Sequence, residues 1–329
     1  MNKKILISSL LIVAVIAVVI FIQTQPQDKS VKIGVLQSWI LEGPFYVAEE
    51  QGFYEEEGVN AEIVEIGSVD EFVPAIVSKD ILVAETIADM FIVQSTQESN
   101  IKQIMRKATL HGLDGIVTTK DVNSAKDLRG KEIAVQTISP SHYLLLNYLR
   151  DGGVSSDEVT LLPTEAGNAG AAFLTGKIDV AVTWEPWLSR ASEREGGKIL
   201  FSTKDSPNLI YDILITRGDL TEQEQEDVKA VMRAWYKALA WMDENPEETV
   251  DIFSRRLGLP KEEVEFFFTK LDFMNYEDNL QFYGTKDNLG PVEAYTNEAA
   301  QIWQEENIIE LKPDPAIIIE TSYLNELYK

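Results

Sequence analysis

The regular alternation of strand-like and helix-like segments is the feature that most restricts the fold of this chain. Between residues 31 and 202, short apolar runs typical of buried strands alternate with longer segments whose apolar residues recur at helical spacing. The alternation occurs as two separate series, and the second begins at residue 131. A region of about 300 residues is too long for one small core and suits two. We therefore predict an α/β protein with two lobes, each built on its own parallel-type sheet.

The predicted strand at 211–217 indicates how the two lobes are connected. Its position after the second series suggests that the chain returns there to the first lobe. From residue 220 onward the pattern is helical, and Thr221 and Glu224 form a capping box at its start. Two crossings between the lobes predict a two-segment hinge, followed by C-terminal helices. The expected division is lobe 1 at 31–118 plus 217–329, lobe 2 at 119–216, and hinge crossings near 117–121 and 205–216.

The N-terminal segment 1–30 is expected to lie outside the fold. Lys3 and Lys4 precede an apolar run at 5–22, which as a helix spans roughly 27 Å. No small-x-small pattern typical of a cleavage site follows the run. The positive flank favours an orientation with the rest of the chain outside. We predict an uncleaved membrane anchor and tether, with the protein on the extracytoplasmic face of the cell membrane. A cleaved signal peptide and a cytosolic protein are the alternatives.

The composition excludes several classes of function. The chain has 29 basic and 54 acidic side chains, a net charge of −25, which argues against binding to nucleic acid or to an anionic membrane surface. The absence of cysteine excludes disulfides and thiolate metal sites, and the two histidines give no metal cluster. The sequence also lacks HExxH, GxSxG and phosphate-loop motifs. We therefore expect no metal, no cofactor and no catalytic residues.

Three segments carry a resemblance to a known family. The first, GNAGAAFLTGKIDVAVTWEPW at 167–187, reads as a short helix, a turn, and a strand that feeds a new helix at Pro186. The others are LRGKEIAVQTISPSHYLLLNYL at 128–149 and GPFYVAEEQGFYEEEGV at 43–59. In this order they resemble the solute-binding proteins of ABC importers for nitrate, sulfonates, taurine, bicarbonate and related compounds. The similarity extends from about residue 31 to residue 217.

The resemblance implies a fold and a function. The fold is the type II periplasmic-binding-protein clamshell, in which two lobes close on a small sulfonate-, nitrate- or taurine-like solute. The partners are the ABC permease and its ATPase, and no chemistry is performed. The family includes relatives that bind thiamin-pyrimidine precursors, so a precursor-binding protein or an enzyme is the alternative. The relatives that make the pyrimidine use a cysteine-rich segment, which this chain lacks. A sensor with the same clamshell is a second alternative.

The candidate solute site lies at four strand-to-helix turns, at 37–44, 85–88, 136–143 and 183–187. In open α/β sheets ligands bind at the carboxyl ends of the strands. The N–H groups at the helix N-termini that follow carry a partial positive charge. The predicted solute-binding residues are Trp39, Thr86, Gln136, Ser139, Ser141, His142, Trp184, Glu185 and Asp212.

Several of these residues allow two interpretations. Trp39 and Trp184 follow strands in opposite lobes, where they can sandwich a flat solute or simply pack between the lobes. Ser139 can help to hold an oxyanion or merely cap its own helix. Glu185 can accept hydrogen bonds from a ligand amine, cap its helix or face the permease. Helix N-termini favour an anionic end such as a sulfonate, whereas Glu185 favours a ligand with N–H donors, such as taurine or an aminopyrimidine.

Overall fold

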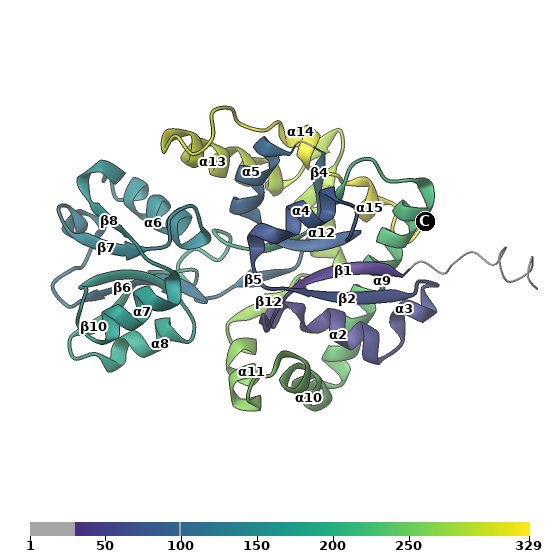
Figure 1. Cartoon of the computed structure of the whole chain (residues 1–329), viewed down its shortest axis with the longest axis horizontal. Helices are drawn as coiled ribbons and strands as arrows, with labels where there is room; N and C mark the ends of the chain where they lie inside the picture. The colour runs from purple at the N-terminus through teal and green to yellow at the C-terminus, as the bar shows by residue number, and fades with distance from the viewer. Residues whose placement is uncertain (1–29, 99) are drawn as a thin grey trace, which may run out of the picture.

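The computed structural model describes residues 30–98 and 100–329 and has two lobes, each with a five-stranded sheet (Figure 1). The sheet of lobe 1 has the strand order β2-β1-β3-β11-β4. Its first three strands are parallel, and β11 runs antiparallel to both β3 and β4. The strands are β1 (Val31–Leu36), β2 (Ala61–Ile66), β3 (Val83–Ile87), β4 (Ile101–Arg106) and β11 (Asp212–Arg217).

The sheet of lobe 2 has the strand order β10-β6-β9-β7-β8. Strand β7 is parallel to β8 and β9, whereas β6 is antiparallel to β9 and β10. The two-lobed α/β fold is thus confirmed, but both sheets are mixed rather than parallel, because the strands that follow the crossings, β6 and β11, enter in the reverse direction. The strands are β6 (Asp114–Thr119), β7 (Glu132–Val135), β8 (Thr160–Pro163), β9 (Val180–Trp184) and β10 (Gly197–Ser202).

The crossings between the lobes occupy short segments. Strand β5 (Ala108–Leu110) pairs with β12 (Leu271–Phe273) in lobe 1, and β6 already belongs to lobe 2, so the first crossing is at 111–113 rather than near 117–121. Gly112 has a φ of 89°, a left-handed conformation that glycine adopts without strain. The return is at 203–211, because β11 lies wholly in the first sheet. We propose lobe limits of 30–110 plus 212–329 and 114–202, which move β6 to lobe 2 and β11 to lobe 1.

Helices cover both sheets. In lobe 2 they are α6 (Pro140–Asp151), α7 (Ala166–Leu174) and α8 (Trp187–Arg190), with short 3₁₀ turns at Ala125–Leu128, Ser156–Glu158 and Ala191–Glu193. The helices of lobe 1 that precede the first crossing are η1 (Ile40–Glu42), α2 (Gly43–Glu50), α3 (Phe53–Glu56), η2 (Val69–Glu71), α4 (Phe72–Val77) and α5 (Ala88–Gln97). After the return come α9 (Glu222–Glu244), α10 (Pro246–Leu257), α11 (Lys261–Phe268), α12 (Tyr276–Tyr283), the hairpin β13 (Gly284–Thr285) and β14 (Asn288–Leu289), α13 (Pro291–Glu305), α14 (Pro315–Ile318) and α15 (Ser322–Asn325).

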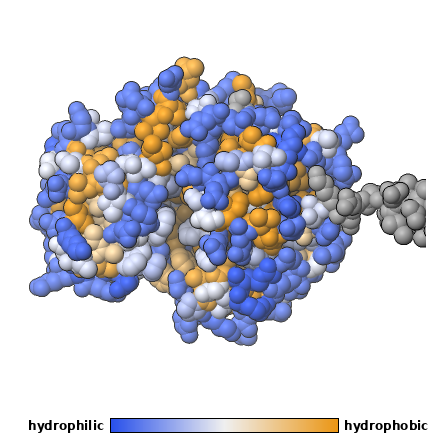
Figure 2. Space-filling view, viewed as in Figure 1, coloured by the Kyte–Doolittle hydropathy of each residue, from blue (hydrophilic) through white to orange (hydrophobic). Residues whose placement is uncertain are grey.

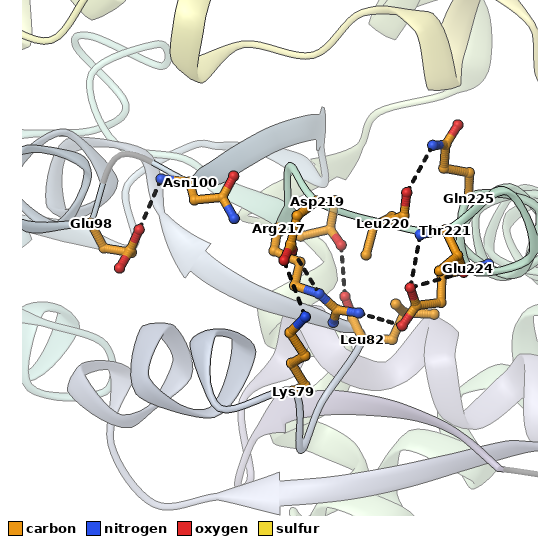
Figure 3. A network of polar contacts seen from close by, with 11 residues as sticks. Lys79, Leu82, Glu98, Asn100, Arg217, Asp219, Leu220, Thr221, Glu224 and Gln225 are labelled. Carbon is orange, nitrogen blue, oxygen red and sulfur yellow. Dashed lines mark hydrogen bonds and ion pairs between the residues drawn. The ribbon is translucent and has the colours of Figure 1, made fainter.

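The C-terminal helices belong to lobe 1 and begin as predicted. Thr221 caps α9 by accepting a hydrogen bond from the backbone N–H of Glu224, and the capping box is complete. The buried face of α9, which includes Trp235, packs against α2. In Figure 3, Arg217 at the end of β11 contacts both Glu224 and Asp219, and Lys79 contacts Asp219 at 3.1 Å. These contacts hold the start of the C-terminal helical segment against the Arg217 end of β11, opposite the end that carries Asp212.

The predicted membrane anchor lies outside the described residues. Within 30–98 and 100–329, no helix has the length and apolar character needed to cross a membrane.

Candidate functional site

The candidate site is the seam where strand ends of the two lobes meet. Figure 2 shows that the surface is hollowed between the lobes. On one side of the seam, α6 of lobe 2 packs against α13 of lobe 1, and Arg150 pairs with Glu298 there. On another, Glu185 of lobe 2 pairs with Lys270 of lobe 1 at 3.1 Å. The lobes are therefore in direct contact.

Trp39 and Asp212 meet at the lobe 1 side of the seam. The indole Nε1 of Trp39 donates a hydrogen bond to Asp212 Oδ2 at 2.6 Å. Asp212 is 1% exposed, and burial raises its pKa well above the ordinary value, as does the charge of Glu85, while Lys107 lowers it. The bond fixes the ring of Trp39 and joins the turn after β1 to the start of β11.

A buried trio of charges lies beneath these strand ends. The ammonium Nζ of Lys107 is 3.0 Å from Glu42 Oε1 and 2.5 Å from Glu85 Oε2, and all three side chains are fully buried. The backbone N–H of Lys107 also donates to the carbonyl of Asp212 at 2.8 Å. Burial and the charge of Glu85 raise the pKa of Glu42. Burial acts to lower the pKa of Lys107, but the nearby carboxylates together raise it. The trio thus ties together the segments that carry Trp39, Thr86 and Asp212.

Thr86 is fully buried next to Glu85, at the end of β3. Its hydroxyl donates a hydrogen bond to the side-chain oxygen of Gln94 at 3.2 Å. Both residues belong to lobe 1, so this hydroxyl stabilises the junction between β3 and α5.

The N-terminus of α6 presents a neutral histidine to the seam. Ser139 Oγ accepts a hydrogen bond from the backbone N–H of His142 at 3.3 Å and donates to the carbonyl of Gln136 at 2.6 Å, so Ser139 caps its helix. The backbone N–H of Ile138 donates to His142 Nδ1 at 3.2 Å, which places the ring proton on Nε2. Burial lowers the pKa of His142 to about 4. Nε2 is buried and has no hydrogen-bond partner within the described part of the chain.

Gln136 and Ser141, the other two candidates on this turn, lie in different environments. Gln136 is half-buried and its side-chain oxygen accepts from the backbone N–H of Ala166 at 3.4 Å. Ser141 is buried in the first turn of α6. The His142 ring lies 5.7 Å from that of Trp303 in α13, which brings α6 against lobe 1.

The turn after β9 holds one exposed indole and one buried carboxylate. A glycine permits the local packing, because a Cβ at Gly170 in α7 would lie 2.6 Å from the Cβ of Trp187 and 2.7 Å from Thr183 Oγ1. Trp184 is 37% exposed. Glu185 is 5% exposed and accepts hydrogen bonds from the hydroxyl of Ser189 at 2.6 Å and from its N–H at 3.0 Å. Glu185 therefore caps its own helix and also pairs with Lys270 in the opposite lobe.

The structure brings the candidates together in groups. Trp39 contacts Asp212, and Ser139 contacts His142 and Gln136. Within residues 30–98 and 100–329, the rings of Trp39 and Trp184 make no contact with each other. That these two indoles sandwich a solute stays a prediction. Sequence reasoning missed the charged groups around these candidates. Glu42 and Glu85 lie within two of the predicted turns but carry no motif, and the other charged groups lie outside the four turns. These others are Asp89, Lys107, Asp114 and Lys270.

A separate cavity of about 390 Å³ lies beside the second crossing. Tyr143 and Asn147 of α6, Tyr295 and Glu298 of α13, and the segment 205–209 contribute to its lining. None of the nine candidate residues lines it, although Tyr143 directly follows His142.

Two mixed five-stranded sheets in two lobes joined by two crossing segments are the fold of the two-lobed periplasmic binding proteins. The chain belongs to the NMT1/THI5 like family of solute-binding proteins, whose model matches residues 42–249.

Individual relatives and structures agree with this assignment. The chain is 26% identical over 303 residues to the taurine-binding periplasmic protein of Escherichia coli (strain K12), a match covering 88% of this chain and 91% of the relative. It is 25% identical over 214 residues to the formylaminopyrimidine-binding protein of Halalkalibacterium halodurans, covering 63% and 64%. The periplasmic aliphatic sulphonate binding protein of Escherichia coli superimposes with a TM-score of 0.73 at 18% identity, covering 89% of this chain and 92% of that one.

The same fold also occurs in an enzyme. The desulfurization enzyme DSZB superimposes with a TM-score of 0.62 at 15% identity, covering 90% of this chain and 98% of that chain. At this identity the likeness concerns the fold alone.

Proposed function

We propose that this protein is the solute-binding component of an ABC importer for a small sulfonate- or taurine-like solute. The observation that carries the proposal is a pair of buried polar atoms at the seam without hydrogen-bond partners among the described residues: His142 Nε2 and the hydroxyl of Tyr211. Leaving such groups unpaired costs free energy, so native proteins pair them with ligand or water. A small polar solute enclosed between the lobes supplies these partners.

The chemistry of the seam favours a solute with two different ends. The Nε2–H of His142 and the N-terminus of α6 suit the oxygens of a sulfonate. The carboxyl groups of Glu185 and Asp212 suit N–H donors and repel a bare anion. An amino-sulfonate satisfies both requirements, whereas nitrate or bicarbonate satisfies only the first.

A formylaminopyrimidine-like precursor is the second candidate. Trp39, held by its bond to Asp212, offers a flat surface for a ring, and the carboxyl groups accept from exocyclic amines. Catalysis on such a precursor is not part of the proposal, since the chain lacks the cysteine-rich segment that the pyrimidine-making relatives use.

The function is tested by thermal unfolding of the detergent-purified full chain with added solutes. A solute at 100 times its dissociation constant is expected to stabilise the protein by about 2.7 kcal/mol. At the same solute concentration, we expect this effect from taurine or a related sulfonate and a smaller one from nitrate and bicarbonate. Stabilisation by a formylaminopyrimidine alone would favour the second candidate, and no stabilisation by any sulfonate would contradict the first.

We further propose that the protein works at the extracytoplasmic face of the membrane, held by the segment 1–30, and delivers its solute to a permease with an associated ATPase. The apolar run at 5–22 and the absence of a cleavage pattern support an uncleaved anchor. N-terminal sequencing of the membrane-extracted protein is expected to start near Met1. A mature start between residues 23 and 30 would show a cleaved signal peptide instead.

A further inference from the structure

The cavity of about 390 Å³ beside the second crossing is built from both lobes. Lobe 2 contributes part of α6 and Phe201 of β10, lobe 1 contributes Phe282 of α12 and part of α13, and the crossing contributes residues of the segment 205–209. Helices α6 and α13 lie side by side and are in contact (Figure 1). Sites for small molecules have volumes of roughly 300–1,000 Å³. The cavity is therefore large enough for a small ligand, and it is complete only while the two lobes are in contact.

Contacts in the wall of this cavity join the two lobes to the crossing. Tyr143 of α6 and Tyr295 of α13 meet edge to face, with their ring centroids 6.3 Å apart. The hydroxyl of Tyr295 also donates a hydrogen bond to the carbonyl of Leu209 in the crossing, at 3.1 Å. None of the nine predicted solute-binding residues lines the cavity. A molecule held here would thus touch both lobes and the crossing without occupying the strand-end site.

The lining of the cavity is acidic and aromatic. Four aromatic rings belong to it, those of the two tyrosines and the two phenylalanines just named, and no lysine, arginine or histidine is among the described residues that line it. Its acidic residues are Asp151, Asp205 and Glu298. Aromatic rings attract organic cations, and carboxylates form charge-assisted hydrogen bonds with ammonium groups. The lining therefore suits a cation with an apolar body and repels an anion.

The two guanidinium groups beside the cavity are engaged within the protein. Arg150 pairs with Glu298 and lies 3.6 Å from Asp151. Arg106 is 1% exposed and donates hydrogen bonds from all three of its side-chain nitrogens, one of them to Asn208 Oδ1 at 2.9 Å. Three carboxylates thus stand against two guanidinium groups, and the local charge stays negative.

Asp205 is the carboxylate of this cavity that has no cationic partner among the described residues. Its Oδ2 accepts hydrogen bonds from the backbone N–H of Ser202 at 2.9 Å and from the Ser202 hydroxyl at 3.2 Å. No three acidic or histidine side chains of the described residues are placed to hold a metal ion. The arrangement therefore suits an organic cation rather than a metal ion.

We propose that this cavity is a second ligand site, which binds a small organic ammonium compound and thereby holds the lobes together. The ammonium group lies near Asp205, and the apolar part of the molecule lies against the aromatic rings. The site goes beyond the proposed function, because it is separate from the strand-end site and does not depend on which solute is transported.

Occupation of this second site couples to solute binding. Because the cavity is complete only while the lobes are in contact, the ammonium compound binds that arrangement better and shifts the equilibrium toward it. A solute enclosed between the lobes favours the same arrangement. The two ligands therefore raise each other's affinity, and thermodynamic linkage requires the factor to be the same in both directions.

The first test compares ammonium compounds with neutral molecules of similar shape. Choline is paired with 3,3-dimethylbutan-1-ol, 2-phenylethylamine with 2-phenylethanol, and putrescine with butane-1,4-diol. Calorimetric titration of the detergent-purified full chain at pH 7 is expected to show at least one ammonium compound binding roughly 5- to 30-fold more tightly than its neutral partner. If none of the three binds more tightly than its partner, the proposal is overturned.

Two variants locate the bound cation. Asp205→Asn keeps an acceptor for Ser202 but removes the charge, and it should weaken binding of the ammonium compound by up to about fivefold. Ser206→Trp places a bulky side chain on the cavity wall and should abolish binding. The matched controls in lobe 2, Asp157→Asn and Ser156→Trp, lie outside the cavity and should bind as the unsubstituted protein does. Equal affinity in all four variants would contradict the assignment to this cavity.

The effect on the lobes is measured without any solute. The chain has no cysteine, so spin labels can be placed selectively at Lys177→Cys in lobe 2 and Glu262→Cys in lobe 1, both exposed positions. The ammonium compound that binds is expected to narrow the distance distribution between the labels, and its neutral partner is not. Adding Ser206→Trp should remove the effect. An unchanged distribution with saturating ammonium compound would contradict the coupling.

Titration of taurine with and without the saturating ammonium compound separates this inference from the proposed function. Tighter taurine binding in its presence is expected. Competition between the two would place the ammonium compound in the strand-end site and overturn the second site, while the proposed function stands. If no sulfonate binds, the proposed function fails, and the neutral-partner comparison, the variants and the label distances still decide on the second site.

Discussion

Replacing Lys107 by methionine is expected to lower the free energy of unfolding by about 3–5 kcal/mol, because it leaves buried carboxyl groups without their cation. Nζ of Lys107 is 3.0 Å from Glu42 and 2.5 Å from Glu85, and no atom of the three side chains reaches solvent. Methionine fills nearly the same volume, so the loss of charge dominates the effect. Urea unfolding of the full chain, compared with Lys79→Met, measures it. Lys79 pairs with Asp219 on the surface, where an ion pair contributes only about 0–1 kcal/mol.

The pH dependence of stability and a variant without the buried carboxylates identify the cause of the stability loss in Lys107→Met. In Lys107→Met, the pKa of Glu42 would rise further above the unfolded-state value of about 4.3, since burial and the charge of Glu85 remain without the ammonium. The difference in stability from the unsubstituted protein should therefore be largest at pH 8 and should shrink as the pH falls toward 5. The triple variant Lys107→Met/Glu42→Gln/Glu85→Gln should regain most of the lost stability. A full loss that persists in the triple variant would indicate a packing defect instead.

The fold could be predicted because its signals are local. The strand predicted at 211–217 corresponds to β11 at Asp212–Arg217, and the capping box of Thr221 and Glu224 marks the start of α9. The segment 101–110 forms two strands divided at Lys107, because β4 pairs with β11 and β5 pairs with β12. Such a division depends on which distant strand lies alongside, and the apolar pattern of the segment does not record it. The same holds for the direction of β6 and β11.

The sequence predicted that the candidate site lies at the strand ends, but it did not predict which charged groups surround the site. The position of Trp39 and Glu185 follows from the turns that hold them. Their partners come from other parts of the chain, and only the folded structure brings them together. Trp39 Nε1 lies 2.6 Å from Asp212 Oδ2, and Glu185 Oε1 lies 3.1 Å from Lys270 Nζ.

The ion pair between Glu185 and Lys270 is expected to control how firmly the closed lobes hold the solute. The pair joins lobe 2 to lobe 1, with Glu185 1% and Lys270 23% exposed in their side chains. If Glu185 also accepts from a ligand amine, Glu185→Gln should weaken taurine binding roughly 10- to 150-fold, since a charge-assisted hydrogen bond contributes about 1.5–3 kcal/mol. Calorimetric titration of the full chain measures the affinity, with exposed Glu195→Gln as the control.

A double-mutant cycle with Lys270→Met separates the two roles of Glu185. If Glu185 acts only through the contact between the lobes, Glu185→Gln and Lys270→Met should weaken binding equally, and the double variant should be no weaker than either. If it also contacts the amine, Glu185→Gln should weaken taurine binding more than Lys270→Met does, and the excess should vanish with isethionate. A bare anion should instead bind more tightly to Glu185→Gln, because a repulsive charge is removed. Affinities unchanged in every variant would show that Glu185 serves only to cap α8 through Ser189.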